Sequence, residues 1–293
     1  MRQKIKQLGC YLIIIILLPY VVTVFLNGPE AESSVSADSN RIKAEHNGKE
    51  SEISIEEYCI GKLAKEIPIS YKSEALKAQA VLVRTAVYQK IRENGSDAIL
   101  GDEFWTAEEM QKQWGMSGYG KNYRKLKDAW EATDGQVLMY GDNLANAPFC
   151  RLTNGNTRDG KEVLGSEDYP YLKIRECPLD IEAKEQIQTT VVDDMDAEIT
   201  ATDTAGYVTG VRVGQEQMSG EEFRTAQGLA SSCFTLQKYD GKLRIVTRGV
   251  GHGLGMSQYT ANEMAKEGKS YEDILAYFFE GTEMKEVADI VLE

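Results

Sequence analysis

The strongest pattern of apolar and polar positions lies between Ser73 and Glu93, a stretch without a helix-breaking residue. Ser73 can cap its start and Gly95 can end it, so the stretch predicts a long helix. At about 100° per residue the positions form an apolar face of Ala75, Leu76, Ala80, Val83, Ala86 and Val87 and a polar face of Glu74, Lys77, Val81, Arg84 and Tyr88. A solvated polar face is the ordinary interpretation of such a pattern. Because this helix is so apolar and rich in alanine, we instead expect a buried helix whose polar face lines a cleft.

The rest of the folded part mixes shorter helical and extended patterns. We expect helices at 106–132, 219–229 and 270–281, strands at 136–140, 147–152, 207–213 and 287–292, a hairpin of 234–238 with 242–247, and a strand or short helix at 53–65. Asp240-Gly241 is a strong hairpin-turn signal, and Ser219 with Glu222 has the form of a capping box. Helices and antiparallel hairpins without a βαβ rhythm predict an α+β fold, a single globular domain around a buried central helix.

The first fifty residues do not have the composition of a folded domain. An apolar run of about 19 residues, 8–26, is long enough to span a bilayer, with Arg2, Lys4 and Lys6 before it. The positive-inside rule then predicts a single-pass cell-membrane protein with a cytoplasmic N-terminus and an extracytoplasmic domain. A cleaved signal peptide is less favoured, because the run is long and no small-x-small site follows closely. We divide the chain into a cytoplasmic stub and transmembrane anchor (1–27), a flexible acidic linker (28–51) and the folded domain (52–293).

The composition of the chain argues against nucleic acid as a partner and against a metal or cofactor. The formal net charge of −13 argues against nucleic acid, whose phosphates need a basic surface. The folded domain has a single histidine, and its cysteines lack the spacing of metal ligands. We therefore expect no metal and no cofactor.

Four cysteines follow the apolar run: Cys59, Cys150, Cys177 and Cys233. An even count in an oxidising compartment favours disulfides, with three possible connectivities. Cys150 with Cys177 closes a moderate loop around a turn-rich segment and is the favoured pair, which leaves Cys59 with Cys233. Four buried free thiols are the alternative.

Glycine occupies every second position from Gly249 to Gly255, in a stretch that continues to Tyr259. Missing side chains let a backbone turn tightly and let a ligand approach closely. The spacing does not fit a dinucleotide fingerprint, a phosphate loop or a serine-hydrolase elbow. His252, Ser257, Gln258 and Tyr259 can all hydrogen-bond hydroxyl groups, so we expect a ligand-contacting loop in preference to a plain one.

Two separated stretches resemble the stage II sporulation protein D family, which includes domains described as amidase enhancers. The first runs through Glu66-Ile67-Pro68, Glu74-Ala75-Leu76-Lys77-Ala78-Gln79-Ala80-Val81 and Arg84-Thr85, and the second is Gly251-His252-Gly253-Leu254-Gly255-Met256-Ser257-Gln258-Tyr259. The resemblance covers nearly all of the chain from Ile55 onward. Phe149-Cys150-Arg151 departs from the Phe-His-Ser of many relatives, which puts metal binding by that loop in doubt.

The resemblance implies a membrane-anchored lytic transglycosylase active in engulfment of the forespore. Its substrate would be the MurNAc–GlcNAc bond of peptidoglycan glycan strands whose stem peptides a partner amidase has removed. The implied partners are that amidase, stage II sporulation protein P, and a membrane scaffold protein. The family's catalytic glutamate falls on Glu74.

One carboxylate is enough for this reaction. Ordinary glycosidases use two, but a 1,6-anhydro product forms when the sugar's own C6 hydroxyl replaces water. Glu74 would act as general acid and then as general base. The helix N-terminus and Lys77 both oppose the acid role, which therefore requires burial in a closed cleft. The expected substrate contacts are Lys77, Arg84, Tyr88, His252, Ser257, Gln258 and Tyr259, with Thr153, Asn154 and Thr157 as weaker candidates.

Two other functions fit parts of the sequence. A non-catalytic glycan-binding module that activates a cell-wall amidase would use the Glu74 face only to grip sugar. A serine protease built on His252 and Ser257 is disfavoured, because both lie in one loop and no orienting acid is evident.

Overall fold

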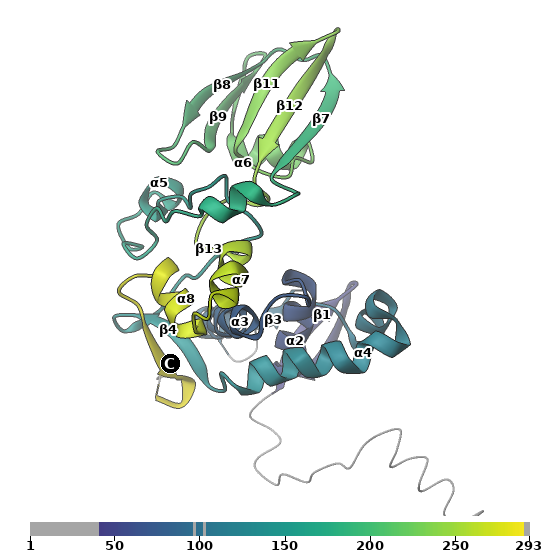
Figure 1. The fold of residues 1–293 in the computed structure, drawn as a ribbon, viewed down its shortest axis with the longest axis vertical. Helices are drawn as coiled ribbons and strands as arrows, with labels where there is room; N and C mark the ends of the chain where they lie inside the picture. The colour runs from purple at the N-terminus through teal and green to yellow at the C-terminus, as the bar shows by residue number, and fades with distance from the viewer. Residues whose placement is uncertain (1–40, 96–97, 102–103, 290–293) are drawn as a thin grey trace, which may run out of the picture. The chain divides into compact units, whose positions relative to one another are not determined.

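The computed structural model describes residues 41–95, 98–101 and 104–289 (Figure 1). The predicted anchor and most of the predicted linker lie outside these residues. Within the part described, no helix combines the length and the apolar character needed to cross a membrane. The chain divides into a unit Met1–Arg41 and a unit Ile42–Glu293, and the elements below belong to the second unit, apart from the first residue of β1. This unit is a mixed α+β domain, as the pattern predicted.

Helix α3 (Ser73–Asn94) is the buried central helix (Figure 1). It packs against α2 (Ile55–Glu66), α4 (Ala107–Glu131), α7 (Gln258–Lys266) and α8 (Tyr271–Phe278). Gly95 ends it with a φ of 81°, as expected. The predicted cap at Ser73 is wrong: Ser73 is already helical, and Lys72 occupies the N-cap without a side-chain bond.

Local capping signals place the neighbouring helices. Thr106 and Glu109 form a capping box at the start of α4, and Ser270 with Asp273 forms one at the start of α8. Ser54 caps α2, which resolves the ambiguity at 53–65 in favour of a helix. Gly115 interrupts α4 with a φ of 71°, so the predicted helix 106–132 is kinked.

The predicted linker 28–51 is wrong from Arg41 onward. β1 (Arg41–His46) lies between β2 (Lys49–Ser54) and β3 (Ile99–Leu100) in a three-stranded sheet. Alternation places Ile42 and Ala44 in the main core, which holds the strand against the helices.

Two antiparallel sheets share a second, smaller core. β8 (Ala197–Thr202), β9 (Val208–Val213) and β10 (Glu216–Ser219) form one sheet, and β7 (Ile187–Asp193), β11 (Phe234–Tyr239) and β12 (Lys242–Arg248) form the other. The buried side chains of both sheets pack against those of α6 (Gly220–Ala226). This helix begins at the predicted capping box of Ser219. The predicted hairpin is confirmed, with Asp240 and Gly241 both at positive φ.

The remaining elements are short. β4 (Gln136–Tyr140) pairs with β5 (Asn143–Leu144) and β14 (Glu283–Glu286), and β6 (Phe149–Cys150) pairs in parallel with β13 (Met256–Ser257). The other elements are α5 (Gly160–Leu164) and the 3₁₀ turns η1 (Pro178–Glu182) and η2 (Val287–Asp289). The strand predicted at 147–152 is thus only two residues long. Of the closing strand predicted at 287–292, residues 287–289 form a 3₁₀ turn instead, and residues 290–292 lie outside the described residues.

Candidate functional site

The Glu74 carboxylate lies where the first turn of α3 meets the start of α8. Its Oε1 accepts a hydrogen bond from Lys77 Nζ at 2.7 Å, and its Oε2 accepts the backbone N–H of Tyr271 at 3.0 Å. The Glu74 side chain remains 29% exposed. Both donors stabilise negative charge on the carboxylate, since one is a cation and the other is the N-terminal end of a helix. The site therefore presents an oriented carboxylate that solvent and a ligand can reach.

Lys77 and Tyr271 complete this corner. The Lys77 ammonium lies 5.7 Å from the centroid of the Tyr271 ring, and the Tyr271 hydroxyl donates to Gln136 Oε1 at 2.9 Å. Lys77 is thus brought beside Glu74, as the helical spacing indicated. Tyr271 was missed, because only the packing of α8 on α3 brings it to the site.

Arg84 shares a helix face with Glu74 but is only 2% exposed. Its guanidinium donates to the carbonyl oxygens of Thr133, Trp130 and Gln136 at 2.5–3.1 Å and stacks on the Trp130 ring at 3.7 Å. Burial lowers the pKa of Arg84. The structure therefore uses this side chain to close the C-terminal end of α4, away from any open surface.

Tyr88 is half-buried between two apolar clusters of the domain. Burial raises the pKa of its phenol. Its ring packs against these clusters, and the expectation that its hydroxyl contacts substrate stays a prediction.

The glycine-rich loop owes its composition to the protein's own packing. Gly253 and Gly255 both have positive φ, 78° and 75°. A Cβ on Gly253 would lie 2.3 Å from the Tyr207 ring, and one on Gly255 would lie 2.0 Å from the Pro148 carbonyl oxygen. The missing side chains thus let other parts of the domain approach the loop backbone closely.

A buried carboxylate, Asp180, anchors the end of this loop. It is fully buried and accepts hydrogen bonds from the hydroxyls of Thr153, Ser257 and Thr260 and from the Thr153 N–H, all at 2.7–2.9 Å. Burial raises the pKa of Asp180, and these hydrogen bonds oppose the rise. Ser257 and Thr153, expected to contact substrate, are committed to this internal acceptor. No sequence signal pointed to Asp180, which sits in the 3₁₀ turn η1.

The other loop candidates also make internal contacts. Gln258 is buried, and its Nε2 donates to the Glu66 carbonyl oxygen at 3.0 Å and to Gln79 Oε1 at 3.2 Å. Asn154 Nδ2 donates to the Ala205 carbonyl oxygen at 2.8 Å. Tyr259 is half-exposed, and its backbone N–H donates to the Arg151 carbonyl oxygen.

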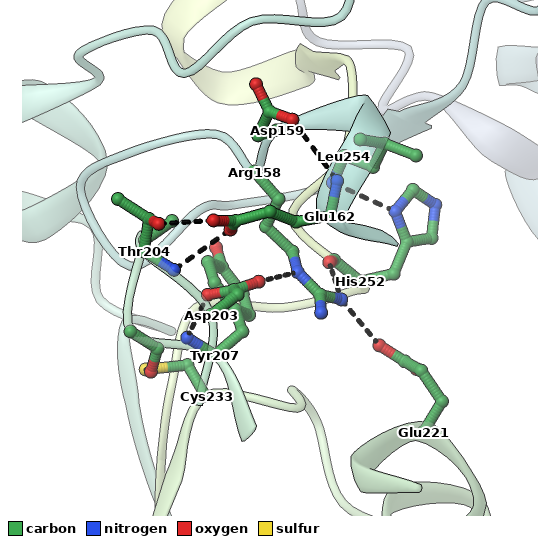
Figure 2. A network of polar contacts seen from close by, with 12 residues as sticks. Arg158, Asp159, Glu162, Asp203, Thr204, Tyr207, Glu221, Cys233, His252 and Leu254 are labelled. Atoms are coloured by element: carbon green, nitrogen blue, oxygen red, sulfur yellow. Dashed lines mark hydrogen bonds and ion pairs between the residues drawn. The ribbon is translucent and has the colours of Figure 1, made fainter. Parts of the chain in front are cut away.

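A buried ion-pair network fixes His252 (Figure 2). Arg158 Nε donates a hydrogen bond to Asp203 Oδ2 at 2.5 Å, and Arg158 Nη1 donates to the His252 carbonyl oxygen at 3.2 Å. The imidazole Nδ1 of His252 accepts the Leu254 N–H at 3.1 Å. Burial lowers the pKa of His252, which favours the neutral ring that this acceptor role needs.

His252 and Glu74 lie on different sides of α3. His252 lines a pocket of about 630 Å³ together with Val83 and Ala86 of that helix. Val83 follows Glu74 by nine residues, which at about 100° each is half a turn away. The structure thus separates the two halves of the groove that the sequence suggested.

The predicted disulfides are wrong in this structure. All four described cysteines are free thiols. Cys59 lies in the main core on α2, whereas Cys233 lies beside Asn154 and the Gly206 carbonyl oxygen. Burial raises the pKa of Cys59 and of Cys177 to about 12, so these thiols stay protonated. Among the described residues no cluster of three His, Cys, Asp or Glu side chains could hold a metal.

Comparison with known proteins decides the family. A family model described as stage II sporulation protein matches residues 44–140. Stage II sporulation protein D of Bacillus subtilis (strain 168) is 29% identical over 98% of this chain and 96% of its own length. The protein of that name from Bacillus amyloliquefaciens is 31% identical over 80% of this chain and 75% of its own length. The chain belongs to the stage II sporulation protein D family.

The stage II sporulation protein D match agrees with the resemblance inferred from the two motifs. The matched segment 44–140 carries Glu74 and Lys77 and the three helices α2, α3 and α4. A further relative, an amidase enhancer of Bacillus subtilis (strain 168), is 27% identical over 76% of this chain but only 39% of its own length.

Proposed function

We propose that this chain is a lytic transglycosylase that cleaves MurNAc–GlcNAc bonds in peptidoglycan strands without stem peptides, during sporulation. Membership of the stage II sporulation protein D family supports a sporulation role. The relative named amidase enhancer supports a role for this chain beside a cell-wall amidase. We take that amidase to be stage II sporulation protein P, and we propose a membrane scaffold protein as a second partner. We further propose that 8–26 anchors the domain on the outer side of the cell membrane.

The observation that carries the proposed reaction is the oriented, partly exposed Glu74 carboxylate. Glu74 would protonate the glycosidic oxygen as its bond to C1 of MurNAc breaks and the next sugar leaves as an alcohol. The resulting carboxylate would then accept the proton of the C6 hydroxyl as the C6 oxygen bonds to C1 and closes the 1,6-anhydro ring. Lys77 and the start of α8 hold this carboxylate in place, and the general acid role requires a bound strand that excludes water from it.

The test is the incubation of the full chain with peptide-free glycan strands, followed by mass spectrometry of the ends. The wild type should produce 1,6-anhydromuramic ends, and Glu74→Gln should slow their appearance by about 10²- to 10⁴-fold. Glu272→Gln is the matched control, because Glu272 is an exposed acid next to Tyr271. Equal rates for the wild type and Glu74→Gln would refute the assignment.

A non-catalytic module that activates an amidase is the second candidate. The relative named amidase enhancer favours it, as does the use of the Glu74 carboxylate by two protein donors. In that case the strands stay intact in the assay above, and addition of the chain accelerates a purified amidase on intact peptidoglycan.

A further inference from the structure

Two hollows of the domain meet at the C-terminal turn of α2. The first, of about 630 Å³, is lined by residues that include Lys62, Lys65, Glu66, Lys90, Phe149 and His252. The second, of about 320 Å³, is lined by residues that include Lys65, Glu66, Pro68, Trp105, Trp114 and Arg151. Since Lys65 and Glu66 border both, the hollows are consecutive, and we call them together the α2 trench.

One end of the α2 trench is aromatic. Trp105 and Trp114 are half-exposed and stand edge to face, with ring centroids 6.2 Å apart. Such rings offer flat apolar faces, and indole N–H groups donate hydrogen bonds at their edges. A sugar ring presents the complementary surface, with C–H groups on its face and hydroxyls around its edge.

The α2 trench is also basic along its length. Lys65 and Lys90 are exposed and Arg151 is half-exposed, with its guanidinium 5.1 Å from the Tyr71 ring centroid. Lys62 is ion-paired with Glu66 at 2.9 Å, and His252 has a pKa lowered by burial. In a chain with a formal net charge of −13, the positive charges of Lys65, Lys90 and Arg151 along the trench favour a negatively charged ligand.

We propose that the α2 trench holds a peptide-free glycan strand, with sugar faces against Trp105 and Trp114 and muramyl carboxylates against Lys65, Lys90 and Arg151. Each hollow has a volume typical of a small-ligand site, and two in succession suit a polymer better than a single small molecule. The proposal rests on the proposed function, because it names where that substrate is held.

The α2 trench is a holding site apart from Glu74. Val83 and Ala86 of α3 line it, and Glu74 points to the other side of that helix, toward α8. Binding and cleavage should therefore respond to different substitutions. Trench variants should lower affinity, and Glu74→Gln should bind strands as the wild type does while failing to cut them.

Fluorescence anisotropy of labelled strands with the full chain tests the binding site. Lys65→Ala with Lys90→Ala should weaken binding about tenfold, and Trp114→Ala by a similar factor, with Trp114→Phe restoring much of the loss. Lys238→Ala with Lys242→Ala is the matched control, because both lysines are exposed on the β11–β12 hairpin. Circular dichroism confirms that each variant is folded.

The charge of the ligand is tested separately. Raising the salt concentration should weaken binding of muramyl strands and leave binding of an uncharged chitin oligosaccharide almost unchanged. If a poly(glycerol phosphate) polymer binds more tightly than the strands and depends on the same lysines, the trench serves a phosphate polymer and the assignment fails.

The outcomes separate the two proposals. Normal binding by the trench variants, in a wild type that cleaves strands, overturns the trench and leaves the proposed function standing. Trench-dependent binding without cleavage by the wild type supports the trench and overturns the enzyme. If Glu66→Gln loses cleavage but binds strands normally, the cleavage reaction takes place in the trench. That result would overturn the assignment of binding and cleavage to separate sites.

Discussion

Glu74 and Asp180 are both carboxylates held by main-chain and side-chain donors, but they lie in opposite surroundings. Glu74 has two donors and keeps 29% of its side chain exposed. Asp180 is fully buried among three hydroxyls and one backbone N–H. An exposed carboxylate can exchange its partners for water or ligand, whereas a buried one cannot. The first arrangement suits chemistry, and the second suits the anchoring of a loop.

Removal of the buried carboxylate should give the largest effect. Asp180→Ala leaves three hydroxyls and an N–H without their acceptor, and we expect it to lower the free energy of unfolding by about 3–5 kcal/mol. Asp180→Asn retains one acceptor oxygen and should cost about 2 kcal/mol. Urea unfolding measures both. A loss below about 1 kcal/mol in Asp180→Ala would show that the hydroxyls find other partners.

The same carboxylate should make stability depend on pH. Burial raises the pKa of Asp180 above its ordinary 3.8, so between 3.8 and the raised value the folded chain binds more protons than the unfolded chain. Its contribution is complete below pH 3.8 and is lost as pH rises through the folded pKa. The stability advantage of the wild type over Asp180→Asn should therefore shrink from pH 4 to pH 7 in urea unfolding. A constant difference contradicts this.

His252 should show the opposite pH dependence. Its pKa is lowered from 6.5 by burial, so the unfolded chain takes up the proton first as pH falls. The contribution is complete above pH 6.5 and is lost as pH falls through the folded pKa, by about 1.4 kcal/mol for each pH unit that separates the folded pKa from the unfolded one. His252→Asn can still accept the Leu254 N–H but cannot titrate. In urea unfolding between pH 7.5 and 5.5, the free energy of unfolding of His252→Asn should therefore lack the pH dependence that His252 gives the wild type.

The contrast between the two acids also marks the limit of the sequence. The helical period was sufficient to predict α3, and glycine signals predicted its end at Gly95 and the turn at Asp240-Gly241, although the cap expected at Ser73 was wrong. Hydroxyl donors such as Ser257 were correctly noticed but were assigned to an external ligand. A hydroxyl in a sequence does not reveal whether its acceptor is a substrate or a distant acid such as Asp180, which lies 77 positions away.

Helix faces have the same limit. Spacing correctly grouped Glu74 with Lys77, but it could not show that α4 covers Arg84. Nor could it show that Val83 and Ala86, on the apolar face of α3, would line a pocket together with His252 of the glycine-rich loop. Which neighbour covers a face depends on tertiary packing, and only the structure supplies it.

The smallest expected effect on stability is that of Glu74→Gln. The glutamine Oε1 can still accept the Tyr271 N–H, and the lost ion pair with Lys77 is partly exposed, so the free energy of unfolding should change by no more than about 1 kcal/mol. Urea unfolding of this variant beside Asp180→Asn gives a direct comparison of one charge removed at each site. A loss of strand cleavage in a variant of wild-type stability would assign the Glu74 charge to the reaction. A destabilisation as large as that of Asp180→Asn would instead make Glu74 a second anchor, one that holds the start of α8 in place.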